Sequence, residues 1–454
     1  MMNSNIPSGW HICTISDVAK VNPSKIIAEP DLVAGFVPMS LAPTDFNGQL
    51  QFEEKAWGEI QKSYTNFQNG DVIFAKVTPC FENGKAAIVD DLPNGIGAGS
   101  SEFYVLRPEQ GAISNRLLFA LLKTNTFAQN GAENMTGAVG LRRVPRAFVE
   151  GFEFPLPPLA EQKVIADKLD TLLTQVETTK ARLDRIPEIL KSFRQSVLSA
   201  AVSGKLIEIT DDDLTECFLS DVSCFQNGYA FKSDWFSDRG DYQVIKLGNV
   251  KDDYLKLDAA PAFLSNELAS DYIKFKPDIG DILLSMTGTK FKRDYGFACV
   301  VNKELPILIN QRVGRIIPDK DKVSPGFLHL FLRSDAFRDQ FFEGETGGVN
   351  QGNVGSKHIM MCKLSLPNLG NQSQITEKAR LLLDYADTVE TQVNNALARV
   401  NNLTQSILGK AFRGELTADW RAANPELISG DNSAAALLDK IKAERALLNK
   451  KKRG

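Results

Sequence analysis

The sequence is poor in the residues that build metal sites and covalent cross-links. It contains three histidines and six cysteines in 454 residues, and no two cysteines stand in a Cys-x-x-Cys spacing. Zinc sites and disulfide frameworks are normally recognised by such spacings, so neither is predicted. Reduced thiols are expected, which fits a cytoplasmic protein.

Long apolar segments are also missing. The longest uninterrupted apolar run is Leu117–Leu122, whereas a membrane-spanning helix needs roughly 20 such residues. The first ten residues, MMNSNIPSGW, lack the charged-then-apolar order of a secretory leader. We therefore expect a protein that is neither secreted nor embedded in a membrane.

An excess of positive charge is absent too. The chain has 52 lysines and arginines against 56 acidic residues, a net charge of -4. Nucleic-acid-binding domains usually carry a basic balance. Any contact with nucleic acid must then come from local groups or from a partner protein.

Catalytic and cofactor motifs are likewise missing. Gly84-Lys85-Ala86 and Gly204-Lys205-Leu206 lack the leading glycine and the hydroxyl of a phosphate-binding loop. Pro157-Pro158 follows Leu156, so the Asp/Asn-Pro-Pro-aromatic motif of amino-methyltransferases is absent, and no Gly-x-Gly-x-x-Gly loop follows a strand pattern. His329 lies in a leucine-rich segment, which is typical of a packed core histidine. We predict a non-enzyme with no catalytic, cofactor or metal site.

What the sequence does contain is a long helical pattern that occurs twice. Apolar residues separated by alternating steps of four and three place one narrow stripe on a helix, which favours a single partner helix. The first ladder is Ile165, Leu169, Leu172, Val176, Thr179, Leu183, Ile186, Leu190, Phe193, Val197 and Ala200. The second, 210 residues later, is Ile375, Ala379, Leu382, Ala386, Val389, Val393, Ala396, Val400, Leu403 and Ile407.

The repeat predicts the fold class. We expect an α+β protein with two repeated mixed α/β domains, separated by two long helices that pair as a coiled coil. Pro158 suits the first turn of the first helix, and Pro187 should bend that helix near Arg185. The segment before this helix, which is the first of the two repeated blocks, should contain short strands at 36–37, 72–75, 86–89, 103–106 and 148–154. It should also contain a helix from Ser114 to about Ala128.

The second block keeps the framework of the first but changes its loops. Asn350-Gln351-Gly352-Asn353 stands where the first block has Gly140-Leu141-Arg142-Arg143. A guanidinium group fits phosphate or guanine, and asparagine and glutamine pair with adenine. The candidate DNA-contacting residues are Lys76, Thr78, Lys85, Arg142, Arg143, Arg146, Thr287, Thr289, Lys290, Lys292, Arg293, Asn350, Gln351 and Asn353. The alternatives are solvated loop charge and ordinary drift between duplicated halves.

The tail, residues 417–454, leaves the repeat. Ser433–Asn449 reads as an amphipathic helix, and Lys450-Lys451-Lys452-Arg453 follows it. Such a tail is either a solvated cationic end or a docking helix for another subunit.

The repeated motif resembles a known family. Leu156-Pro157-Pro158-Leu159-Ala160-Glu161-Gln162 opens a heptad helix that ends with Gln195-Ser196-Val197-Leu198 and Gly204-Lys205-Leu206, and the pattern recurs over 366–416. The combination resembles the specificity subunits of type I restriction-modification systems, particularly those of the K family.

The resemblance implies a division of the chain. Residues 1–154 and 207–364 would be target recognition domains, here called the first and second blocks. Residues 155–206 and 365–416 would be the spacer helices, packed antiparallel in a coiled coil, and 417–454 a docking tail. Each block would read one half of a bipartite site in double-stranded DNA. Two DNA adenine methyltransferase subunits and, in the nuclease form, two restriction/translocase subunits would supply the chemistry.

A different class of function remains open. A coiled-coil adaptor that holds two ligand-binding domains apart, with no nucleic acid involved, would show the same helices and the same repeat. Dependence of DNA binding on a methyltransferase partner would distinguish the two.

Overall fold

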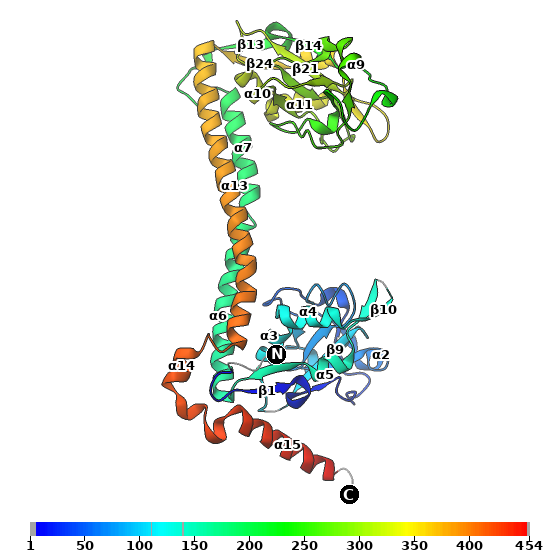
Figure 1. The fold of residues 1–454 in the computed structure, drawn as a ribbon, viewed down its shortest axis with the longest axis vertical. Helices are drawn as coiled ribbons and strands as arrows, with labels where there is room; N and C mark the ends of the chain where they lie inside the picture. The colour runs from blue at the N-terminus through cyan, green and yellow to red at the C-terminus, as the bar shows by residue number, and fades with distance from the viewer. Residues whose placement is uncertain (1–5, 110, 139, 452–454) are drawn as a thin grey trace. The chain divides into compact units, whose positions relative to one another are not determined.

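The computed structural model describes residues 6–109, 111–138 and 140–451, and divides into two compact units (Figure 1). Unit 1 comprises Met1–Asp184 and Asn395–Gly454, and unit 2 comprises Arg185–Asn394. Each unit therefore holds one globular block and parts of the long helices. Among the described residues, no helix combines the length and apolar character that crossing a membrane requires.

The first block is built on two four-stranded sheets and a strand pair. One sheet has the order β2-β9-β6-β7 and is antiparallel throughout; the other has the order β4-β3-β8-β5, with β3 and β8 parallel. The strands are β1 His11–Thr14, β2 Ala19–Val21, β3 Val33–Val37, β4 Glu53–Ala56, β5 Thr65–Gln68, β6 Val72–Ala75, β7 Ala86–Ile88, β8 Ile96–Gly99, β9 Phe103–Pro108 and β12 Glu153–Leu156, with β1 paired to β12. The strands expected at 36–37, 72–75, 86–89 and 103–106 are confirmed.

The helices of the first block are α1 Ile15–Val18, α2 Trp57–Ile60, α3 Asn115–Leu122, α4 Asn125–Glu133 and α5 Arg146–Gly151. Ser114 caps α3 as expected, since its hydroxyl accepts from the Leu117 N–H at 3.1 Å. The expected single helix to Ala128 is in fact two, because Thr124 caps a second one. Most of the strand expected at 148–154 is instead helix α5, and only residues 153–154 of that range lie in a strand, β12. Phe148 of α5 and Phe152, directly after the helix end, both pack on Phe127.

The second block repeats this plan. Its sheets have the orders β14-β21-β17-β19, β16-β15-β20 and β18-β23-β22, and β13 pairs with β24. The strands are β13 Leu214–Phe218, β14 Ser223–Asn227, β15 Tyr242–Ile245, β16 Phe263–Leu264, β17 Ile282–Ser285, β18 Thr287–Gly288, β19 Ala298–Val300, β20 Ile307–Ile309, β21 Val313–Pro318, β22 Glu345–Thr346, β23 Gly352–Val354 and β24 Lys363–Pro367. The helices are α8 Leu219–Val222, α9 Asn266–Ser270, α10 Pro325–Arg333, α11 Asp335–Glu343 and α12 Ser356–Met360.

The long helices are α6 Leu159–Leu183, α7 Ile186–Val202 and α13 Leu369–Phe412. Pro158 is the N-cap of α6 rather than part of its first turn. Pro187 lies in the first turn of α7, so the expected bend near Arg185 is a complete break between two helices. The 44-residue α13 contains no proline and continues without interruption.

The helices pack in an antiparallel manner inside unit 2. Arg194 of α7 pairs with Asp387 and Glu390 of α13 at 2.7 and 2.6 Å. The later α7 residues Val197, Leu198 and Ala201 share a core with the earlier α13 residues Ile375, Ala379 and Leu383. The chain therefore runs in opposite directions along the two helices.

The apolar ladder is correct at its ends and wrong in places along it. Ile165, Leu169, Ile375 and Ala379 are buried as expected, but Thr179 and Leu403 are exposed. Leu173 and Leu383 are buried, while Leu172 and Leu382 are only half-buried. Near the blocks a helix packs on the block as well as on its partner helix, so its apolar stripe widens beyond one ladder.

One glutamine in each copy of the repeated motif ties a long helix to its block. The Gln162 Oε1 accepts from Ser114 N–H at 3.0 Å, and its Nε2 donates to Ala112 O and Pro157 O at 3.0 and 3.1 Å. In unit 2 the Gln372 Oε1 accepts from Ser324 N–H at 2.7 Å, and its Nε2 donates to Lys322 O and Pro367 O at 3.0 and 2.7 Å. A side chain that is both donor and acceptor is required here, which explains why the motif ends in glutamine.

Within unit 1, the tail packs on the first block and on α6. The buried Glu161 carboxylate accepts from the Trp10 indole at 2.8 Å, the Thr417 hydroxyl at 2.6 Å and the Arg421 guanidinium at 2.5 Å. Helices α14 Ala418–Ala423 and α15 Ala434–Lys451 follow, and Leu438 and Ile441 of α15 enter the core of the first block. At least part of the apolar face of α15 is therefore covered by its own chain. Lys452 and Arg453 of the basic end lie outside the described residues.

Candidate nucleic-acid interface

A short hairpin in unit 1 carries two of the expected arginines. Strands β10 Thr136–Ala138 and β11 Leu141–Arg143 pair with Arg143 opposite Thr136, and β10 stands out at the edge of the first block in Figure 1. The Thr78 N–H donates to Arg142 O, and the Thr78 hydroxyl accepts from Arg142 N–H, both at 3.0 Å. The hairpin is thereby fixed to the chain that leaves β6. Val139 lies outside the described residues.

Each of the three arginines is paired with a group of its own block. Arg142 Nη2 lies 3.2 Å from Glu82, and Arg143 binds Glu102 through Nε and Nη2 at 2.9 and 2.8 Å. Arg146, at the start of α5, binds Glu150 and Val21 O instead. Arg146 therefore does not belong to the hairpin cluster.

The two lysines of the first block are separated in the same way. Lys76 Nζ donates to Ser101 O at 2.8 Å, next to Glu102. Lys85 Nζ donates to Met39 O at 2.7 Å and lines a different pocket together with Lys123. The structure thus groups Lys76, Thr78, Arg142 and Arg143 and leaves Lys85 and Arg146 outside that group.

The second block has a hairpin at the equivalent position. Strands β22 and β23 pair with Thr346 opposite Asn353, and β18 adds Thr287 opposite Asn353. The Thr287 hydroxyl donates to Asn353 Oδ1 at 2.9 Å. Asn350 and Gln351 are exposed at the tip of this hairpin.

A second loop, residues 289–294, lies beside this tip. Thr289 N–H donates to Asp294 at 2.7 Å, and Lys290 Nζ approaches Gly347 O at 3.5 Å. Lys292 is exposed, whereas Arg293 turns to Asp339 of α11 at 2.9 Å. The contact between Lys290 and Gly347 brings the two loops together.

Two charged residues that sequence reasoning missed also lie at these hairpins. Glu102 carries the ion pair of Arg143, and Arg312 is the residue 210 positions later. The Glu102 carbonyl accepts from Lys76 N–H at 2.9 Å, and the Arg312 carbonyl accepts from Met286 N–H at 3.0 Å, so the positions are structurally equivalent. The Arg312 side chain is exposed and makes no ion pair within the described chain. A charge reversal between aligned halves is the sequence signal that would have identified both.

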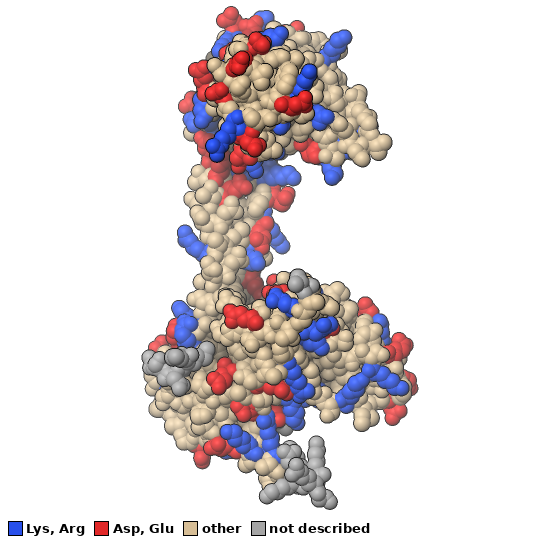
Figure 2. Space-filling model, turned by 45° about the vertical axis from the view of Figure 1, so that its right-hand side comes forward, with Lys and Arg blue, Asp and Glu red and all other residues tan. Residues whose placement is uncertain are grey.

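Charge elsewhere on the surface is mixed. Figure 2 shows lysine and arginine among aspartate and glutamate over the visible face of each unit. The local hairpin groups, rather than a broad basic field, are therefore the features suited to DNA.

The described residues contain no cluster of three or more potential metal ligands. Burial raises the pKa of Cys13, Cys299 and Cys362 to about 12, so these thiols are poor nucleophiles at neutral pH. Burial also lowers the pKa of His329, whose Nε2 lies 3.2 Å from Ala298 O. His329 is the packed core histidine that its sequence context predicts.

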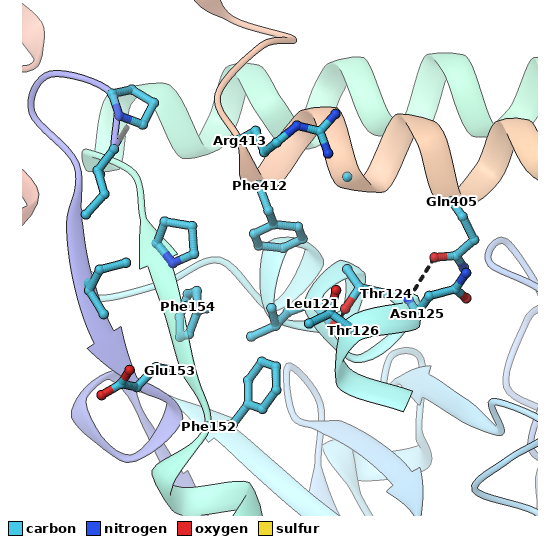
Figure 3. A pocket seen from close by; sticks show the side chains of 15 residues that line it. Leu121, Thr124, Asn125, Thr126, Phe152, Glu153, Phe154, Gln405, Phe412 and Arg413 are labelled. Carbon is cyan, nitrogen blue, oxygen red and sulfur yellow. Dashed lines mark hydrogen bonds between the residues drawn. The ribbon is translucent and has the colours of Figure 1, made fainter. Parts of the chain in front are cut away.

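A cavity of about 530 Å³ in unit 1 is separate from the hairpin (Figure 3). Leu121, Phe152, Phe154, Phe412 and Arg413 line it. At its edge the Gln405 side chain accepts from Asn125 N–H at 2.8 Å and donates to Lys123 O at 2.9 Å (Figure 3). None of the fourteen candidate DNA-contacting residues lines this cavity.

Known proteins match nearly the whole chain. The family model for the type I restriction modification DNA specificity domain matches residues 7–188 and 211–399. The EcoKI specificity subunit of Escherichia coli strain K12 is 34% identical over 475 aligned residues, which cover 100% of this chain and 99% of that protein. The EcoBI specificity subunit of Escherichia coli is 40% identical over 338 residues, or 70% and 69% of the two chains.

Solved structures match the fold. The HsdS subunit from Thermoanaerobacter tengcongensis superimposes with a TM-score of 0.63 at 20% identity and covers 91% of this chain and 99% of its own. A chain from a study of complex assembly in a type I R-M system gives a TM-score of 0.70 at 20% identity, covering 90% and 99%. These likenesses support the α+β class with two domains and long helices. The family model and the full-length relative establish that this chain belongs to the specificity subunits of type I restriction-modification systems.

Proposed function

We propose that this chain reads a bipartite, asymmetric site in double-stranded DNA for a type I restriction-modification complex. The first block, residues 1–154, reads one half of the site, and the second block, residues 207–364, reads the other. The helical regions 155–206 and 365–416 separate the two readers, and the tail, 417–454, contributes to subunit docking. The observation that carries this proposal is the pair of equivalent hairpins with different polar side chains.

The hairpins have the properties that base reading requires. Their backbones are fixed by pairing with the chain beyond β6 and with β18, so their side chains are presented from a rigid support. Arg143 in one block and Asn353 in the other occupy the same position. Arginine is suited to guanine and asparagine to adenine, so like frameworks would read unlike bases.

The remaining candidate residues fit backbone contact better than base reading. Lys76, Lys290 and Lys292 each carry a flexible ammonium group that suits phosphate. Thr78 and Thr287 hold the hairpins, and Lys85, Arg146 and Arg293 are the weakest candidates because they point to other parts of their blocks.

The chemistry belongs to partners. Two DNA adenine methyltransferase subunits, and two restriction/translocase subunits in the nuclease form, assemble on this chain, which itself binds no cofactor. It works in the cytoplasm, where the DNA lies. The names of its relatives as specificity subunits support this division of labour.

A block replacement tests the proposal. The full chain is assembled with its methyltransferase subunits, residues 10–154 are replaced by the corresponding block of a related subunit, and methylated sites are mapped by sequencing. We expect one half of the methylated site to change and the other to remain. The isolated chain serves as the control and should transfer no methyl groups.

A change in both halves would show that the blocks are not independent readers. Methylation that does not depend on this chain, together with no DNA binding by the assembled complex, would favour a coiled-coil adaptor instead.

A further inference from the structure

The pair formed by Arg143 and Glu102 has a specific geometry. Both carboxylate oxygens of Glu102 are engaged, one by Arg143 Nε at 2.9 Å and one by Nη2 at 2.8 Å. The hydrogen bond from Arg143 holds the pKa of Glu102 below its usual value, and the nearby Lys76 acts in the same direction. Glu102 is therefore ionised at neutral pH, and the guanidinium plane is fixed by two parallel hydrogen bonds.

This arrangement leaves one edge of the guanidinium group available. A guanidinium group has two edges that each present a pair of parallel N–H donors: one formed by Nε and Nη2, the other by Nη1 and Nη2. Glu102 takes the first edge. Within the described chain, Nη1 of Arg143 donates to no acceptor. The second edge matches the O6 and N7 acceptors that guanine presents in the major groove.

The other arginines of the first block are not prepared in this way. Arg142 has a single contact of 3.2 Å with Glu82, so its plane is not fixed. Arg146 uses Nε for Glu150 and Nη2 for Val21 O, two groups of its own block that hold it away from the hairpin cluster.

The charge of Glu102 also argues against a phosphate role for this group. A carboxylate beside the hairpin repels a phosphate and offsets the attraction of Arg143 for it. The same carboxylate does not oppose the neutral edge of a base. A carboxylate-fixed arginine thus favours base reading over backbone contact.

We propose that Glu102 is a positioning residue that presents Arg143 to a guanine in the half-site read by the first block. The inference rests on the proposed function and adds a base identity to it. The second block provides an internal contrast, because Arg312 and Asn353 stand at the positions of Glu102 and Arg143. The half-site read by the second block is therefore not read by such a pair.

Modified DNA tests the inference without altering the protein. The wild-type complex with its methyltransferase subunits is titrated with duplexes in which each guanine of the first half-site is replaced in turn by 7-deazaguanine, which keeps O6 and lacks N7. Replacement at one position should weaken binding about 10-fold to 100-fold. If no guanine in that half-site is sensitive, the inference is wrong even though specific binding persists.

Three variants assign the contact. Arg143→Ala should abolish the 7-deazaguanine penalty at that position alone, and Arg143→Lys should restore only part of it, because an ammonium group can donate to N7 but has no planar fork for Glu102 to hold. Glu102→Gln should reduce the penalty and broaden the methylated sequence at that position while the rest of the site is kept. Glu102→Asp, which retains the charge, should keep part of the preference.

The matched control is Glu82→Gln, which removes the carboxylate beside Arg142 and should leave the preference unchanged. An undiminished penalty in Glu102→Gln would overturn the positioning role. A preference altered at a cytosine instead would overturn it as well, since it would make Glu102 a direct reader. Failure of the proposed function is distinguishable, because the wild-type complex would then show no sequence-dependent binding to any duplex.

Discussion

The two blocks share one hydrogen-bonded framework and differ in the side chains attached to it. Ser114 and Ser324 cap equivalent helices, and Gln162 and Gln372 make the same three contacts to the backbone around them. The glutamines are buried and the serines half-buried, and their hydrogen bonds satisfy backbone groups, so substitution at any of them is costly. The framework is therefore the part of each block that cannot vary independently.

The differences are polar and charged side chains whose partners also differ between the blocks. Four equivalent positions, 210 residues apart, carry different residues in the two blocks. The pairs are Arg143 and Asn353, Glu102 and Arg312, Glu161 and Asn371, and Lys123 and Arg333. The first two pairs lie at the hairpins. Glu161 holds the tail in unit 1, whereas Asn371 is half-buried and Arg333 binds Asp252 and Asp253. The same fold thus supports different recognition in each block and a tail on only one of them.

The largest expected effect on stability comes from breaking the ion pair of Glu161, which has no counterpart at Asn371. Arg421→Ala leaves the fully buried Glu161 carboxylate without its cation, which should destabilise unit 1 by about 3–5 kcal/mol. Chemical unfolding and hydrogen exchange in α14 and α15 measure it. Asn371→Ala is the matched control and should be nearly neutral. Equal effects would show that Glu161 does not hold the tail.

The framework glutamines should be almost as important and equal to each other. Gln162→Ala and Gln372→Ala each remove three hydrogen bonds to buried or half-buried backbone groups, so each should cost about 2–4 kcal/mol. Gln175→Ala, on an exposed position of α6, is the control. Unfolding followed by circular dichroism measures the loss. A large loss at only one glutamine would contradict the equivalence of the two blocks.

The stability of unit 1 should depend on pH because of Lys123. Arg333, at the equivalent position, should add no such dependence to the stability of unit 2. Burial lowers the pKa of Lys123 from 10.5 to about 8. Between these values the unfolded chain binds the proton more strongly than the folded one, so stability should rise with pH from about 8 to 10.5. The full rise in the free energy of unfolding across this range should be roughly 3 kcal/mol.

Denaturant midpoints measured between pH 7.5 and 10.5 test this expectation. Lys123→Met should flatten the rise in unit 1. A guanidinium group does not titrate in this range, so Arg333→Met should leave the slope unchanged. A slope that persists in Lys123→Met would assign it to another group.

The smallest expected effect concerns Arg312. Arg312→Ala removes an exposed cation beside the second hairpin and should weaken DNA binding by the assembled complex by about 1 kcal/mol, with the salt slope reduced by about one. Arg239→Ala, an exposed arginine in the loop before β15, is the control. No change in affinity or salt slope would leave Arg312 as a solvated charge.

The repeat, the fold class and the family could all be predicted from the sequence. Apolar residues at steps of four and three, a recurring Leu-Pro…Gln entry and a fixed offset are local or periodic signals, and packing rules convert them directly into helices and domains. The sequence also identified Ser114 as a cap, since the preference of serine for that position is local.

Contacts between side chains from distant parts of the chain could not be predicted from the sequence. Phe148 lies in helix α5 rather than in a strand, and both Phe148 and Phe152, which follows the helix end, pack on Phe127, a residue that local sequence patterns do not connect to them. Arg143 and Arg146 look alike in sequence, yet one is fixed at the hairpin by Glu102 and the other is turned to Val21. Ion-pair partners and core contacts depend on chain segments brought together by folding, and no local pattern or single-residue preference contains that information.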